Sequence, residues 1–113
     1  MHAGESAMTA IDRAHLAAQT GGDEALAAEI LGLFAAQCRR LLPGIADRSL
    51  AFPDRADLAH TLKGSAAGIG AGRVQDLAGR VEAALRDAAE PGAEIAALEE
   101  QAAAALAEIA DAA

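Results

Sequence analysis

The chain has 113 residues, which suits one domain with a single core. Hydrophobic residues make up 53 % of it, but there is no Trp or Tyr and only two Phe. Much of the apolar content is alanine, the strongest helix former, so the composition favours an all-α protein. A formal charge of -8 argues against binding to nucleic acid or to an anionic membrane surface and favours a protein or small-molecule partner.

Sorting signals and metal motifs are not found in the sequence. The single cysteine, Cys38, allows no disulfide within the chain, and no paired Cys and His motif is present. The start lacks the basic and apolar regions of a signal peptide, and no apolar run approaches the roughly 20 residues that span a bilayer. We therefore expect a cytoplasmic protein with one domain over residues 1–113 and a flexible terminus at residues 1–8. The start at Met1 favours a free-standing protein.

Clusters of Gly and Pro divide the chain into five helical stretches. We expect a short helix over residues 9–18 with Thr9 as its N-cap, and a second helix from about Asp23 to Ile45, kinked or interrupted at Pro43. Further helices are expected over residues 54–69 and 73–89 and after Pro91. Each long stretch has one apolar stripe and the connections are short, which predicts an antiparallel four-helix bundle with a short additional N-terminal helix.

The apolar stripes also predict which side chains form the core. They are Leu26, Ile30, Leu33, Phe34, Leu41 and Ile45 in the second stretch, Leu58, Leu62, Ser65 and Ile69 in the third, Val74, Leu77, Val81 and Leu85 in the fourth, and Ile95, Leu98, Ala102, Leu106 and Ile109 in the last.

His60 lies on the third helix, opposite its apolar stripe. At about 100° per residue it is roughly 160–200° from Leu58 and Leu62 and points at solvent. Lys63 and Gly64 follow one turn later, and small residues such as Ala56 are expected to leave the surrounding surface bare. A glycine inside a helix costs about 1 kcal/mol relative to alanine, so Gly64 is expected to give another molecule room beside the imidazole.

This arrangement suits phosphoryl chemistry. A histidine is largely neutral at physiological pH, and its unprotonated ring nitrogen is then a nucleophile. Lys63 can place a positive charge beside phosphate oxygens, where phosphoryl transfer needs it. A lone histidine or lysine on a helix is more often an ordinary solvated residue, and His2 and His15 have no supporting neighbours. It is the joint placement of His60, Lys63 and Gly64 that favours a phosphate-accepting site.

The segment over residues 59–71, AHTLKGSAAGIGA, resembles the phosphoacceptor block of the histidine-containing phosphotransfer (HPt) domain family. The pairs at residues 11–12, 22–23 and 81–82 extend the resemblance over nearly the whole chain. The chain departs from the family pattern at Gly68, which is expected to loosen and shorten the end of the third helix.

The resemblance implies a four-helix bundle in which His60 is phosphorylated on Nε2 by transfer from an aspartyl phosphate on a receiver domain. It implies that Lys63 assists with the phosphate and that Gly64 gives the partner access. Glu82 matches a position where a carboxylate or amide can accept a hydrogen bond from Nδ1–H and fix the ring tautomer. An ordinary surface carboxylate is the alternative interpretation of Glu82.

The function implied is that of a phosphorelay intermediate, which accepts a phosphoryl group on His60 and passes it to another receiver in two-component signalling. Expected partners are response-regulator receiver domains and a hybrid histidine kinase, with exposed apolar and small residues of the second helix helping a receiver to dock. No Gly-rich nucleotide loop is present, so the chain is expected to be a stoichiometric carrier and not an enzyme. It would need no cofactor of its own, with Mg²⁺ on the receiver.

Two alternatives stay open at this point. The chain could be a non-catalytic helical interaction module, although an intact His60, Lys63 and Gly64 argue against that. It could also be the phosphoacceptor domain of a larger hybrid or chemotaxis-type histidine kinase.

Overall fold

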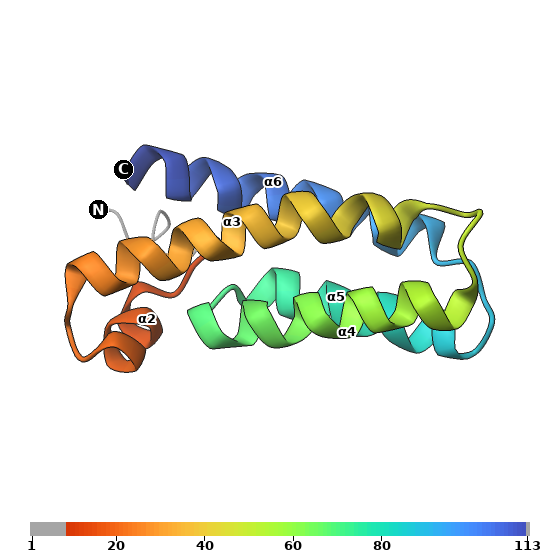
Figure 1. Cartoon of the computed structure of the whole chain (residues 1–113), viewed down its shortest axis with the longest axis horizontal. Helices are drawn as coiled ribbons and strands as arrows, with labels where there is room; N and C mark the ends of the chain where they lie inside the picture. Colours follow the sequence, from red (N-terminus) through yellow and green to blue (C-terminus); the bar gives the residue numbers. More distant parts are fainter. Residues whose placement is uncertain (1–8, 113) are drawn as a thin grey trace.

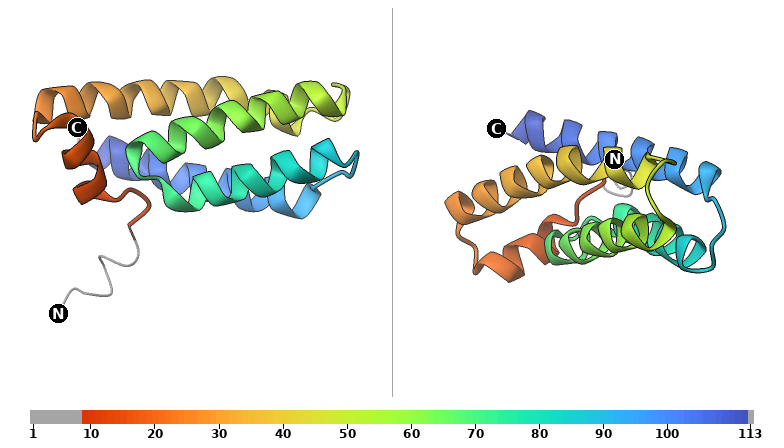
Figure 2. Two further views of the ribbon diagram at one scale, coloured as in Figure 1. Left: turned by 90° about the horizontal axis from the view of Figure 1, so that it is seen from below. Right: turned by 45° about the vertical axis from the view of Figure 1, so that its right-hand side comes forward.

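The computed structural model describes residues 9–112, so the expected flexible terminus at residues 1–8 lies outside the described residues. The described chain forms helices and no strand: α2 (Arg13–Thr20), α3 (Glu24–Ala46), α4 (Phe52–Ile69), α5 (Gly72–Arg86) and α6 (Gly92–Ala112). Helices α3 to α6 alternate in direction along the long axis, and α2 lies across one end (Figures 1 and 2). This confirms the predicted four-helix bundle with a short N-terminal helix. Within residues 9–112, no helix is both long and apolar enough to cross a membrane.

The first helix begins later than the sequence suggested, at Arg13 instead of Thr9. Asp12 is its N-cap, because its side chain accepts a hydrogen bond from the His15 N–H at 3.1 Å. The Asp12 N–H itself donates to the Gly70 carbonyl at 2.9 Å. This bond ties the residues before α2 to the turn between α4 and α5, so they are not free to extend the helix.

Helix α3 begins after the N-cap Asp23, as predicted, and is not interrupted at Pro43, which lies inside it. Helix α4 also extends further than expected, because Pro53 occupies its first turn and Gly68 stays helical. The predicted shortening at Gly68 was wrong. The helix ends at Gly70, whose φ of 78° is the left-handed conformation that glycine adopts most easily.

Most of the predicted stripes lie in the core or pack against it, with Ile30, Leu77, Leu106 and Ile109 only half-buried. Leu26 and Leu33 on α3 are 39 % and 66 % exposed, so they lie outside the core. On α4, Leu58 and Ser65 are only half-buried. The fully buried α4 positions are mostly alanines, namely Ala56, Ala59, Leu62 and Ala66. Because α4 packs against both α3 and α5, its buried face is wider than a single stripe, and small side chains let both neighbours approach closely.

Arg55, near the start of α4, is buried at the far end of the bundle from α2, with 1 % of its surface exposed. Its Nε donates to the Ile45 carbonyl at 2.9 Å, and its two terminal nitrogens donate to the Glu90 carboxylate at 2.7 and 2.8 Å. The side chain therefore joins the end of α3 to the connection between α5 and α6. Sequence analysis did not single it out.

Candidate functional site

His60 lies in the middle of α4, and its side chain is 63 % exposed. Its Nδ1 faces Glu82 of α5, at 3.1 Å from one carboxylate oxygen and 3.3 Å from the other. The predicted outward direction and the predicted partner both agree with this geometry. Nε2 lies on the other side of the ring from Nδ1, away from the carboxylate.

Close packing of α4 against α5 brings these two side chains together. Ala59, directly before His60, and Ala78 of α5 are both fully buried. Small residues at a helix contact let the backbones approach, so the flanking side chains of the two helices can meet at the rim. Val81 is also fully buried, which fixes the rotation of α5 and places Glu82 at that rim.

The Glu82 carboxylate contacts three side chains that are cationic or can donate a hydrogen bond. Besides His60, the Lys63 ammonium lies 2.9 Å from one of its oxygens and the Arg86 guanidinium 3.2 Å from the other. Arg86 also pairs with Asp57, one turn before His60, at 3.1 Å. The carboxylate is only 13 % exposed, so it holds its partners with little competition from water.

The charge of Glu82 decides the tautomer of His60. Burial alone would raise the pKa of the Glu82 carboxyl, but hydrogen bonds from Lys63, His60 and Arg86 outweigh it, and the pKa is lowered from its usual value. Glu82 is therefore ionised at neutral pH. An ionised carboxylate only accepts hydrogen bonds, so the bond to His60 requires the proton on Nδ1 and leaves the lone pair on Nε2.

The sequence-predicted residues thus share one surface, with two differences in detail. Lys63 is bound to Glu82 and not directed freely at the space beside the ring. Ala56 was expected to contribute to the bare surface around His60, but it is fully buried and does not. Gly64 does contribute, because a Cβ built on it would meet nothing within 4 Å.

Arg86 and Asp57 were missed by the sequence analysis. The signal was available, because Arg86 follows Glu82 by one helical turn and Asp57 precedes His60 by one. This spacing points to Arg86 and Asp57 only once Glu82 is assigned to the site.

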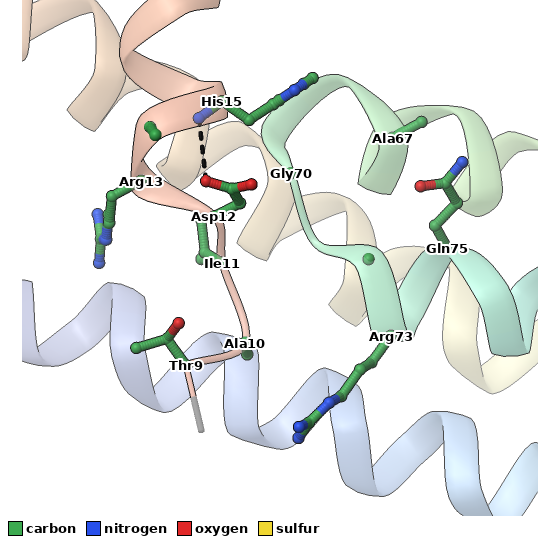
Figure 3. Close-up of a pocket in the computed structure, with 12 residues that line it drawn as sticks. Thr9, Ala10, Ile11, Asp12, Arg13, His15, Ala67, Gly70, Arg73 and Gln75 are labelled. Carbon is green, nitrogen blue, oxygen red and sulfur yellow. Dashed lines mark hydrogen bonds between the residues drawn. The ribbon is translucent and has the colours of Figure 1, made fainter. Parts of the chain in front are cut away.

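His15 lies in a different environment. A hollow beside the turn between α4 and α5 is lined in part by Asp12, His15, Gly70 and Arg73 (Figure 3). The His15 side chain packs next to Gly70, and its Nε2 is buried without a hydrogen-bond partner among the described residues. A buried ring nitrogen is not accessible to a group on another protein. Of these two histidines, only His60 exposes its ring to such a group.

A shallow groove between α3 and α4 includes Gly64, which lies one turn after His60. It is lined by Leu33, Gln37, Gly64 and Gly68, among other residues. Leu33 is the most exposed large apolar side chain in the described part of the chain. An exposed leucine beside two glycines gives the surface an apolar point and room for a helix of another protein.

Comparison with known proteins identifies a family for the chain. The model of the Hpt domain family matches residues 29–112, which include all four predicted site residues and most of α3 to α6. No curated protein and no solved structure matches the chain significantly. Within residues 9–112, no group of three or more His, Cys, Asp or Glu side chains is arranged to hold a metal ion.

Proposed function

Because the chain belongs to the Hpt domain family, whose members carry out histidine phosphotransfer in two-component signalling, we propose that it is a phosphorelay intermediate. It accepts a phosphoryl group on His60 from the aspartate of one receiver domain and passes it to another receiver. The observation that carries this proposal is the exposed His60 ring with its Nδ1 engaged by Glu82.

The first transfer requires no base in this chain. The Nε2 lone pair forms a bond to phosphorus while the bond from phosphorus to the aspartyl oxygen breaks, and that electron pair leaves with the aspartate. The proton stays on Nδ1, and Glu82 stabilises the positive charge that develops on the ring. In the second transfer the aspartate of the next receiver attacks phosphorus, and Nε2 regains its lone pair.

Lys63 and the receiver share the task of neutralising the phosphate. A phosphoryl group on Nε2 brings negative oxygens within a turn of Lys63, where they compete with Glu82 for the ammonium. The Mg²⁺ of the reaction belongs to the receiver, and the chain acts as a stoichiometric carrier. The receiver docks a helix over Gly64 and Gly68, with Leu33 as the apolar anchor.

The test is transfer of radiolabel from a phosphorylated receiver domain to this protein. The label should appear as an adduct that is labile in acid and stable in alkali. His60→Gln should abolish it and keep the helical circular dichroism spectrum, whereas the matched variant His15→Gln should still accept label. Labelling of His60→Gln would refute the proposal, and a wild-type protein that accepts no label from any receiver would favour the non-catalytic interaction module.

A further inference from the structure

Two helical glycines near His60, Gly64 on α4 and Gly79 on α5, differ in their surroundings. A Cβ built on Gly64 would meet nothing within 4 Å, so the missing side chain leaves space for another molecule. A Cβ built on Gly79, in the middle of α5, would lie 3.3 Å from Cδ of Lys63. That distance is tighter than an ordinary van der Waals contact, so the Lys63 side chain occupies the space that Gly79 leaves.

The path of Lys63 explains why this space matters. The side chain starts on α4, crosses α5 at Gly79, and ends with its ammonium 2.9 Å from Glu82, one turn further along α5. Its side chain is 38 % exposed, which is ordinary for a lysine whose stem lies along a neighbouring helix. A larger residue at position 79 would occupy the path of the stem.

The composition of α5 indicates that helix propensity does not explain the glycine at position 79. Gly79 lies on the half-buried flank of a helix, where alanine is favoured over glycine by about 1 kcal/mol in the absence of other contacts. Neighbouring α5 positions include Ala78, Ala83 and Ala84, so the sequence uses alanine freely here. Glycine is the residue that leaves the stem of Lys63 its place.

We propose that Gly79 is a positioning residue for phosphoryl transfer, which seats the Lys63 stem across α5 so that the ammonium lies beside both Glu82 and the phosphoryl group received by His60. This inference rests on the proposed function for its second half. Its first half, the seating of Lys63 on Glu82, can be measured without phosphate.

The first measurement is the pKa of the Glu82 carboxyl, followed by NMR titration. In Gly79→Leu, which keeps a good helix former at the position, the displaced ammonium no longer supports the Glu82 charge, so the pKa should rise relative to wild type. Gly79→Ala should give a smaller rise. The matched control is Gly32→Leu on α3, where a built Cβ meets nothing within 4 Å, and which should leave the Glu82 pKa unchanged.

The second measurement is a double-mutant cycle on the rate of label transfer. Gly79→Leu should slow transfer by about tenfold, the low end of the effect of one charge-assisted hydrogen bond, because the site is partly exposed. In a Lys63→Met background, which keeps a stem but removes the charge, Gly79→Leu should cause no further loss. A purely structural role would slow both backgrounds alike.

The outcomes separate the two claims. If wild type accepts phosphate but Gly79→Leu changes neither the Glu82 pKa nor the transfer rate, the role of Gly79 is refuted and the proposed function stands. An equal loss in the Lys63→Met background also refutes it. If wild type accepts no phosphate, the proposed function fails, and the Glu82 pKa alone then decides whether Gly79 seats Lys63.

Discussion

Removal of the Glu82 carboxylate should slow phosphoryl transfer about tenfold. In Glu82→Ala the His60 ring loses the acceptor 3.1 Å from Nδ1 that fixes its tautomer and offsets the charge developing during attack. A hydrogen bond to a charged group contributes about 1.5–3 kcal/mol. The lower end applies here because the ring is 63 % exposed and water can replace part of the interaction. About 1.4 kcal/mol corresponds to a tenfold change in rate.

The assay is a single-turnover measurement of label transfer from a phosphorylated receiver, with Glu100→Ala on the exposed face of α6 as the control for loss of one carboxylate. Nitrogen NMR should show the proton of His60 on Nδ1 in wild type and shared between the two nitrogens in Glu82→Ala. Glu82→Gln keeps an acceptor oxygen and should lie between the two. A rate for Glu82→Ala within twofold of wild type, with the tautomer unchanged, would refute the assigned role of Glu82.

The same carboxylate makes stability depend on pH in the acid range. Because the folded-state pKa of Glu82 is lowered, its contribution to stability is complete above the pKa of an unfolded glutamate, about 4.3. The contribution is lost as the pH falls through the lower folded-state value. In urea unfolding at a series of pH values, the free energy of unfolding should therefore fall less steeply toward acid pH for Glu82→Gln than for wild type. Equal slopes would contradict the stabilising role of the Glu82 charge.

Three further predictions concern other parts of the chain. Gly64→Leu should slow transfer while leaving helicity unchanged, because the added side chain projects into the space for the partner; an unchanged rate would contradict that role. Arg55→Ala should destabilise the fold by about 3 kcal/mol in urea unfolding, whereas Arg48→Ala, exposed and paired with the same glutamate, should cost less than about 1 kcal/mol. Similar losses for the two arginine variants would show that burial is not the cause. Burial raises the pKa of the Cys38 thiol to about 11, so a thiol reagent at neutral pH should modify it only in urea, and rapid labelling of the native protein would contradict this.

Helical periodicity was enough to predict where His60 points. A residue about half a turn from an apolar stripe faces solvent in any packing that buries the stripe, so no knowledge of neighbouring helices is needed. The partnership with Glu82 could not be obtained that way, because it depends on the distance and rotation of α5 relative to α4. The family resemblance supplied that pairing, and the geometry agrees with it.

Arg55 and Leu33 show where single-helix reasoning fails. Arginine is rarely buried unless paired, and the partner of Arg55 lies 35 residues further along the chain, so only the assembled fold brings them together. Leu33 fits the stripe of α3 by spacing but is exposed, because the neighbouring helices cover only part of the circumference of α3. The start of α2 was predicted too early for a similar reason, since the bond between Asp12 and Gly70 is made across the fold.

The proposed acceptor site takes His60 and Lys63 from one helix and Glu82 from another, and the alanine contact between α4 and α5 sets their spacing. A peptide containing only α4 would keep the HTLKG segment and its helical tendency but would lose the carboxylate that orients the imidazole. Under the proposed function, acceptance of phosphate depends on tertiary structure, so efficient transfer would report a folded bundle and not merely a helical chain.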